Sequence, residues 1–294
     1  MKILILGSEG MLGREILFQL TNVVDRKVEI FATCRGEMYS DNASEERFNA
    51  VTQFDASKSS IVLDVLNRIC PDVVINCIGV IKQHGSTISE HRYFYLNACL
   101  PRIINVWCKN RSARLLHFST DCVFSGKKGD YSLKDKPDAF DIYGLSKILG
   151  EVDDSNSLTI RTSIVGLERK SNQGLLSWFF SNPDESSVNG YDHVLYSGLT
   201  TSYLAGLVVE KFLDHNYSGL IQLGGPKISK YDLLSMANEV FSRNIHINKH
   251  SKIRSDKSLS SDSIYLKLGI SQPSWKELLV HLRDNSIETN TKKV

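Results

Sequence analysis

Short uninterrupted apolar runs alternate along the chain with stretches whose apolar residues recur at helical spacing. Residues 3–6 form the first such run, and apolar side chains at 11, 12, 16, 17 and 20 follow it, which predicts a strand and then a helix. The same pattern predicts further strands over 28–34, 72–79, 114–120 and 158–165, and further helices over 59–70 and 88–109. Strands that alternate with helices predict an α/β fold, a Rossmann-type doubly wound parallel sheet buried on both faces.

The C-terminal part of the chain carries shorter and more mixed elements. The pattern predicts helices over 174–180 and 201–214 and strands over 193–197 and 219–225, and two capping boxes, at Ser229 and Ser274, predict two more helix starts. We therefore expect an NAD(P)-binding domain over 1–166 and a smaller substrate-binding lobe over 167–284. Some strands and helices of that lobe are expected to pack back on the first domain, and 285–294 to form a polar tail.

A glycine-rich loop follows the first predicted strand and precedes the first predicted helix. Glycines let the backbone approach a pyrophosphate closely, and the start of a helix supplies free N–H groups and the positive end of its dipole. Strand, glycine loop and helix in this order predict a dinucleotide site rather than an ordinary tight turn. The residues expected to bind the cofactor here are Gly7, Ser8, Gly10, Met11, Leu12 and Gly13.

The end of the second strand indicates which dinucleotide is bound. An acidic residue that would take a ribose 2′-hydroxyl is missing there, and Arg35 stands in its place. A guanidinium suits a 2′-phosphate, so we expect NADPH, while Glu37 nearby keeps NADH open. Residues 54–56 look like the end of a short additional strand, and Asp55 there is expected to meet the adenine.

A Ser-Thr-Asp strand end and a Tyr-x-x-x-Lys helix provide the candidate chemistry. Tyr143 and Lys147 are four residues apart on a predicted helix, so their side chains share one face, and Thr120 ends the preceding strand. A free tyrosine has a pKa near ~10, and a nearby lysine cation is expected to lower it. Tyr143 would then exchange a proton with a carbonyl oxygen that Thr120 holds by a hydrogen bond.

Four further positions have a functional and a plain structural interpretation. Asn97 is expected to contact either the ribose or the backbone, or to lie on a helix surface. Trp178 either stacks on a base or sugar or packs in a core. The basic run 249–257, which ends at Lys257, either holds a diphosphate or is a solvated loop. Gly79 is expected to let the backbone pass beside the cofactor.

Composition excludes several classes of function. With 35 Lys+Arg against 33 Asp+Glu the net charge is +2, which gives no reason to expect nucleic acid as a partner. No apolar run is long enough to span a membrane, and the N-terminus lacks the pattern of a signal peptide. The six cysteines contain no C-x-x-C pair, so we expect reduced thiols, a cytoplasmic location and no metal site. Dependence on Mg²⁺ stays open, as does a homodimer.

Several segments together resemble one known family over nearly the whole chain. The chain is similar to the extended short-chain dehydrogenase/reductases, and within them to the dTDP-4-dehydrorhamnose reductase branch. The resemblance is carried by GSEGMLG at 7–13, PDVVINCIG at 71–79, STDCVFSG at 119–126, YGLSK at 143–147, RTSIVG at 161–166 and GLTT at 198–201.

The resemblance implies a role for each matching residue. Thr120, Tyr143 and Lys147 match the catalytic trio, and Lys147 also binds the nicotinamide ribose in that family. The adenine and ribose contacts are matched by Asp55, Ala56, Cys77, Ile78 and Gly79. The expected substrate contacts are Gln83, Thr120, Asp121, Ser163, Ile164, Trp178 and Lys257.

Two departures bear on the substrate. The family usually has aromatic residues where Cys122 and Ile164 stand, and losing them opens space near the sugar. We therefore expect NADPH-dependent reduction of the C4 ketone of a nucleoside-diphosphate 4-keto-6-deoxy sugar, dTDP-4-dehydrorhamnose-like or a UDP-2-acetamido-4-keto-6-deoxyhexose, for a surface polysaccharide or O-antigen. The alternatives are a non-catalytic NAD(P)-binding regulatory subunit, and a nucleotide-sugar epimerase or dehydratase.

Overall fold

The computed structural model describes residues 1–23, 27–36, 47–81, 88–169, 172–214 and 216–291. Two compact units share the chain, and each is built from separate stretches. The first comprises Met1–Val123, Phe140–Arg161 and Ala205–Ile221; the second comprises Phe124–Ala139, Thr162–Leu204 and Gln222–Val294. These compact units interleave along the chain. The expected division into two domains at residue 166 stays a prediction.

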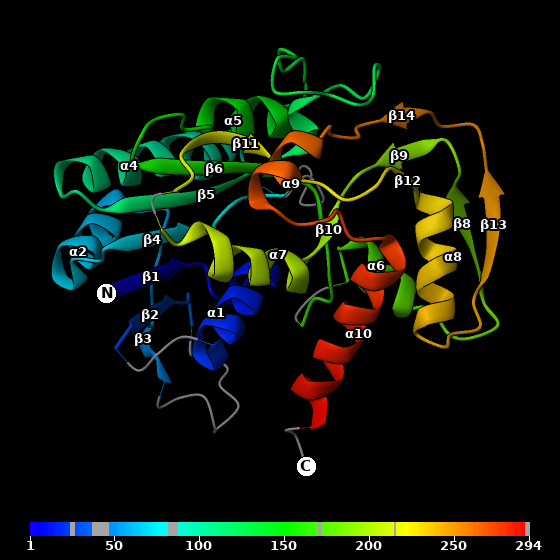
Figure 1. Cartoon of the computed structure of the whole chain (residues 1–294), viewed down its shortest axis with the longest axis horizontal. Coiled ribbons are helices and arrows are strands. Elements are labelled where there is room, and N and C mark those ends of the chain that lie inside the picture. The colour runs from blue at the N-terminus through cyan, green and yellow to red at the C-terminus, as the bar shows by residue number, and fades with distance from the viewer. Residues whose placement is uncertain (24–26, 37–46, 82–87, 170–171, 215, 292–294) are drawn as a thin grey trace. The chain divides into compact units, whose positions relative to one another are not determined.

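A seven-stranded sheet forms the centre of the first unit (Figure 1). Its strand order is β11-β6-β5-β4-β1-β2-β3, and the pairs β3–β2, β2–β1, β1–β4 and β4–β5 are all parallel. The chain order reverses between β1 and β4, as in a doubly wound sheet. The strands are β1 (Lys2–Leu6), β2 (Glu29–Thr33), β3 (Asn49–Val51), β4 (Val73–Asn76), β5 (Arg114–Thr120), β6 (Ser157–Thr162) and β11 (Gly219–Gln222).

Helices cover both faces of this sheet (Figure 1). Buried side chains of α2 and α4 pack with alternate residues of β1, β4 and β5, and α1 packs with η5. Residues Ile3 to Leu6 of β1 are all fully buried, because a central parallel strand has apolar neighbours on both sides. The helices are α1 (Met11–Val23), α2 (Ser59–Ile69), α3 (Glu90–Phe94), η3 (Tyr95–Cys99), α4 (Leu100–Asn110), η4 (Asp121–Val123), α5 (Ile142–Gly150), α7 (Thr201–Leu207) and η5 (Val208–Phe212). The α/β prediction is confirmed.

The single helix expected over 88–109 is interrupted. The segment η3 is a π-helical turn between α3 and α4, and it carries Asn97 fully buried. Gly150, the last residue of α5, lies so close that a Cβ built on it would be 1.8 Å from the Asn97 carbonyl oxygen. The absence of a side chain at residue 150 therefore lets α5 pack directly on this turn.

The second unit combines small sheets with helices. Strands β7 and β10 form one pair, β8 and β13 another, and β12, β9 and β14 a three-stranded sheet. The strands are β7 (Ile164–Val165), β8 (Ser187–Tyr191), β9 (Val194–Tyr196), β10 (Leu199–Thr200), β12 (Ile228–Ser229), β13 (His246–His250) and β14 (Ser255–Asp256). The helices are α6 (Leu175–Phe180), α8 (Lys230–Val240), α9 (Asp262–Leu268) and α10 (Trp275–Thr291).

Both predicted capping boxes start helices of this unit. The Ser229 hydroxyl accepts a hydrogen bond from the Asp232 N–H at 3.0 Å, and the Ser274 N–H donates to the Glu277 carboxylate at 2.7 Å. The last helix continues to Thr291, so the tail expected from residue 285 begins inside a helix. Neither proline nor glycine occurs after Trp275 to end the helix earlier.

We predict opposite effects for two glycine-to-alanine substitutions in helices of the structure. Gly150→Ala should lower the free energy of unfolding by about 1–3 kcal/mol, because its methyl group has no room against Asn97. Gly206→Ala should leave it unchanged or raise it by up to about 1 kcal/mol, since a Cβ there meets nothing within 4 Å. Urea denaturation of both variants measures this, and equal stability of the two would contradict the packing described.

Candidate functional site

The glycine loop has the geometry of a phosphate-binding turn. Gly7 has a φ of 81°, and its carbonyl oxygen accepts a hydrogen bond from the Gly10 N–H at 3.1 Å. A Cβ on Gly13 would lie 2.3 Å from the Gly7 oxygen, so only glycine allows the first turn of α1 to approach the loop this closely. These residues therefore fit a dinucleotide pyrophosphate at the start of α1.

The ends of β2 and β4 hold this loop in place. Thr33 accepts from the Gly7 N–H at 3.0 Å, and the Ser8 hydroxyl donates to the Thr33 carbonyl at 3.0 Å. On the other side, a Cβ on Gly7 would lie 2.9 Å from the Ile78 side chain. Of the expected cofactor residues, Cys77 and Ile78 thus lie beside the loop, just beyond the carboxyl end of β4, and Gly79 follows them in the chain.

The other residues expected to bind the cofactor differ in their exposure and in their hydrogen bonds. Arg35 is exposed, two residues beyond β2. The Asp55 carboxylate accepts hydrogen bonds from the N–H and the hydroxyl of Ser57 at 3.0 and 2.7 Å, which lower its pKa. Leu12 and Ala56 are buried, whereas Met11, the first residue of α1, is half-buried.

Lys147 is a buried cation on α5. Its ammonium donates a hydrogen bond to the Phe118 carbonyl of β5 at 2.7 Å, and a Cβ on Gly79 would lie 3.7 Å from its Nζ. Burial lowers the pKa of Lys147 to about 8, although Glu151 and Cys77 act to raise it. The lysine thus joins the ends of β4 and β5 beside the glycine loop.

Tyr143 is half-buried one turn before Lys147 on α5. Burial raises the pKa of its phenol, Cys122, Asp121 and Asp141 raise it further, and a hydrogen bond with Thr120 acts the other way. This direction is opposite to the lowering expected from Lys147, because the cost of removing the phenolate from water outweighs the Thr120 hydrogen bond. The phenol is therefore neutral at pH 7 and carries the proton that an acid must supply.

Thr120 is fixed by its own strand end. Its hydroxyl donates to the Asp121 carboxylate at 3.1 Å and accepts from the Cys122 N–H at 3.1 Å, and both Thr120 and Asp121 are buried. A hydrogen bond between Thr120 and Tyr143 then joins β5 to α5, so two residues of the expected catalytic trio meet.

Asn97 makes the backbone contact that was one of its expected roles. Its side-chain oxygen accepts from the Val80 N–H at 2.8 Å, and its amide donates to the Val80 carbonyl at 3.0 Å and to Ser146 at 3.1 Å. These hydrogen bonds hold the chain after Gly79 in place. Because Asn97 is fully buried, it does not lie on a helix surface.

Sequence reasoning missed a buried ion pair behind Lys147. Arg161 donates to the Glu151 carboxylate at 2.9 and 2.7 Å, and the Ser119 hydroxyl donates to it at 2.7 Å. Their side chains are only 2% (Arg161) and 10% (Glu151) exposed. The signal was the spacing of Glu151, four residues after Lys147 on the same helix face.

His117, on β5, was also missed. Its Nδ1 lies 3.2 Å from the Asn76 amide, and burial, with Lys147 nearby, holds its pKa well below the usual value. It is therefore a neutral group beneath the site.

The first unit holds two of the expected substrate contacts, Thr120 and Asp121, and the others are not among its described residues. Gln83 lies outside the described residues. Ser163, Ile164, Trp178 and Lys257 belong to the second unit, where Ile164 pairs with Leu199. Trp178 is 38% exposed on α6, so it does not pack in the core.

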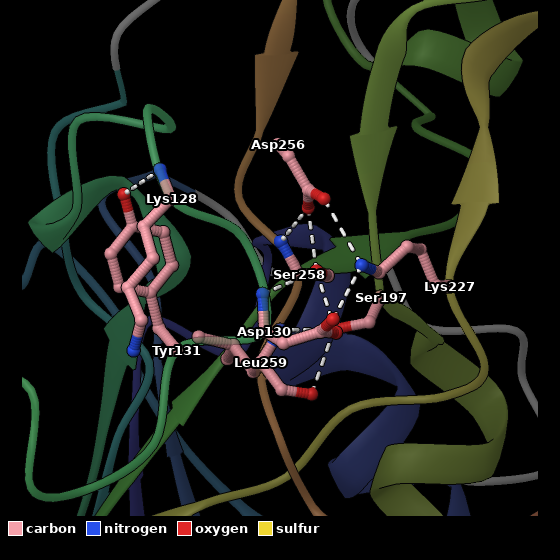
Figure 2. A network of polar contacts seen from close by, with 8 residues as sticks. All are labelled: Lys128, Asp130, Tyr131, Ser197, Lys227, Asp256, Ser258 and Leu259. Atoms are coloured by element: carbon pink, nitrogen blue, oxygen red, sulfur yellow. Dashed lines mark hydrogen bonds and ion pairs between the residues drawn. The ribbon is translucent and has the colours of Figure 1, made fainter.

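A polar cavity of about 280 Å³ lies within the second unit. Figure 2 shows the network at its rim, in which Lys227 contacts Asp130 at 2.7 Å and Asp256 at 3.1 Å and Ser258 contacts both carboxylates. None of the expected substrate residues lines it, and Lys227 in its lining is paired with Asp130 and with Asp256. We interpret it as a structural network.

Two absences hold for the part of the chain that the structure describes. Within it, no group of three or more His, Cys, Asp and Glu side chains is placed to hold a metal ion. Within the same ranges, no helix has the length and apolar character needed to cross a membrane.

Comparison with known proteins gives partial matches in sequence and full-length matches in fold. A probable low-salt glycan biosynthesis reductase, Agl14, of Haloferax volcanii is 32% identical over 118 residues, which are 38% of this chain and 39% of that protein. The chain thus spans less than half the length of the curated relatives it matches.

Two solved structures share the fold. A hypothetical dTDP-4-dehydrorhamnose reductase from Sulfolobus tokodaii has a TM-score of 0.74 at 26% identity, covering 92% of this chain and 96% of that one. The dTDP-4-dehydrorhamnose reductase of Bacillus anthracis, solved in complex with NADP, has a TM-score of 0.75 at 20% identity, covering 98% and 99%. Residues 1–178, more than half of the chain, match the family described as RmlD substrate binding domain, and the protein belongs to that family.

Proposed function

We propose that the protein is an NADPH-dependent reductase of the C4 ketone of a nucleoside-diphosphate 4-keto-6-deoxy sugar. One observation carries the proposal: the glycine loop and the buried Lys147 both lie against the end of β4. Gly7 of the loop lies against Ile78, and the adjacent residue Gly79 lies against the Lys147 ammonium. A dinucleotide held by the loop would thus run along the strand end toward Lys147.

The residues of the chain supply what a carbonyl reduction needs beside a hydride. A bound nicotinamide would supply the hydride to C4. The neutral Tyr143 phenol donates its proton to the C4 oxygen. The Thr120 hydroxyl would turn its one proton from Asp121 to the same oxygen as charge develops on it. The Lys147 cation then stabilises the phenolate left behind, which its burial makes costly. Lys147 would also bind the nicotinamide ribose.

The choice of NADPH follows from Arg35. Its exposed guanidinium beyond β2 is available to a 2′-phosphate. The Bacillus anthracis structure of similar fold was solved with NADP, which agrees with this choice. Gly7, Gly10 and Gly13 would hold the pyrophosphate, and Asp55, Cys77 and Ile78 would line the adenine and ribose.

Our proposal for the identity of the sugar rests on the two positions where this chain lacks the family's aromatic residues. Cys122 follows Asp121 at the end of β5, and Ile164 starts β7; both side chains are smaller than the aromatic ones usual in the family. The extra room favours a UDP-linked 2-acetamido-4-keto-6-deoxyhexose over dTDP-4-dehydrorhamnose. A role in a surface polysaccharide, a cytoplasmic location and a homodimer stay predictions.

One assay separates this proposal from its rivals. Purified protein is mixed with NADPH and a panel of dTDP- and UDP-linked 4-keto-6-deoxy sugars, and absorbance at the nicotinamide band is followed. A reductase consumes NADPH in proportion to product. Conversion of the sugar without net NADPH use would show an epimerase or dehydratase. Binding of NADPH without conversion of any sugar would show a regulatory subunit.

We predict that Gly13→Ala impairs NADPH binding. Its Cβ would displace the loop, and losing one or two hydrogen bonds to charged phosphates, about 1.5–3 kcal/mol each, weakens binding by roughly 10- to 10³-fold. Fluorescence titration with NADPH measures the affinity, with Gly206→Ala as the control. Unchanged affinity would show that the loop does not hold the dinucleotide.

We predict that Tyr143→Phe lowers kcat by roughly 10²- to 10⁴-fold while NADPH affinity survives, because only the transferred proton is lost. Tyr217→Phe is the matched control: it also removes one phenol hydroxyl, and the Tyr217 group that binds Arg114 of β5 is the backbone carbonyl, which the substitution keeps. Near-normal turnover of the Tyr143 variant would refute its role as the acid.

The pKa of Lys147 predicts how the rate depends on pH. The folded-state pKa is about 8, below the usual 10.5, so the ammonium loses its proton as pH rises through 8. Since the mechanism needs the charged form, kcat/KM should fall on the alkaline side near pH 8. A profile that stays flat up to pH 10 would contradict a role for the cation.

A further inference from the structure

Two consecutive residues of β5 anchor the last turn of α5. Lys147 donates to the Phe118 carbonyl at 2.7 Å, and Glu151, the residue that ends the helix, accepts from the Ser119 hydroxyl at 2.7 Å. Thr120, the next residue of the strand, belongs to the site. The turn that carries Lys147 is therefore fastened to the strand end that carries Thr120.

The Glu151 carboxylate and the backbone around it are held by two arginine side chains. Arg161 of β6 binds it with two hydrogen bonds of 2.9 and 2.7 Å, and β6 is next to β5 in the sheet. From α4, the Arg102 guanidinium donates to the backbone carbonyls of Leu149 and Glu151 at 2.6 and 3.3 Å. A carboxylate so buried and bound has little freedom to move away from the helix face that it shares with Lys147.

Charge makes this arrangement more than a packing contact. Arg161 and Lys147 are both buried cations. The Glu151 carboxylate binds Arg161 directly, and its negative charge acts to raise the pKa of Lys147. The other titratable groups that face Lys147 are neutral: Cys77 at the end of β4 and His117 on β5, because burial raises the thiol pKa and lowers the imidazole pKa. Tyr143 on α5 is neutral as well.

We propose that Glu151 is a positioning residue, the counter-ion that keeps Lys147 charged and in place, with Arg161 and Ser119 holding its carboxylate. The inference rests on the proposed function, since it gives Lys147 a part in turnover. Without Glu151, the Phe118 carbonyl is the contact described above that would still oppose the cost of burying the ammonium, since the Cys77 thiol is neutral.

The test compares two substitutions that break the same ion pair from opposite sides. Glu151→Gln removes the negative charge, so the pKa of Lys147 should fall by roughly one unit. Arg161→Gln removes a cation and leaves the carboxylate to Lys147, so that pKa should rise. Glu151→Asp keeps the charge and should stay near the wild-type value. A purely structural pair would give no opposite shifts, because both Gln variants lose the same contact.

Two readouts follow each variant of the full chain. The first is a pH titration of the Lys147 side chain by NMR with ¹⁵N-labelled lysine, the signal being assigned with Lys147→Arg. The second is the alkaline limb of kcat/KM with NADPH and the sugar that the panel identifies. If one Gln variant does not fold, the sign of the shift in the other still decides, because each has its own predicted direction.

The outcomes separate this inference from the function beneath it. Opposite shifts in both readouts support the counter-ion role. Opposite NMR shifts with an unchanged rate profile support the counter-ion and contradict the part of Lys147 in turnover. An unchanged Lys147 titration in a folded Gln variant overturns the inference, whatever happens to the activity.

Discussion

The hydrogen bond between the Lys147 ammonium and the Phe118 carbonyl is the contact on which the site depends. The ammonium is out of water there, and apolar contacts cannot replace the hydration that a cation loses on burial. The cost is met by a carbonyl at a strand end and by the Glu151 carboxylate one turn further on. Because α5 must stay docked for both contacts to exist, Tyr143 on the same helix is held beside Thr120.

This arrangement also explains why burial acts differently on the two neighbours. It lowers the pKa of Lys147 and raises that of Tyr143, so each group is pushed toward its neutral form. For the tyrosine, the neutral form is the acid that a ketone reduction uses. For the lysine, the neutral form cannot stabilise a phenolate, so a counter-ion is needed to favour the charged form. Burial therefore favours the protonation state that the mechanism needs for Tyr143 and disfavours the one it needs for Lys147.

Much of the fold was predictable from local pattern. The glycine loop and the Tyr143–Lys147 spacing follow from strict rules of backbone and helix geometry, and the buried strands follow from apolar runs. The pKa direction of Tyr143 did not follow, because burial is a property of the folded chain. Nor did the π-helical turn at Asn97 or the pairing of Glu151 with Arg161, which joins residues from α5 and β6. The interleaving of the two units also depends on distant strands pairing in one sheet.

The most direct test of the whole account is a crystal structure of the protein with NADP⁺ and the product nucleotide sugar. The account predicts the Tyr143 oxygen within about 2.6–3.2 Å of the sugar's C4 oxygen. It also predicts the Lys147 ammonium on the nicotinamide ribose and the pyrophosphate on the Gly7–Gly13 loop. A nicotinamide ring remote from Tyr143, or a sugar whose C4 faces another residue, would contradict it.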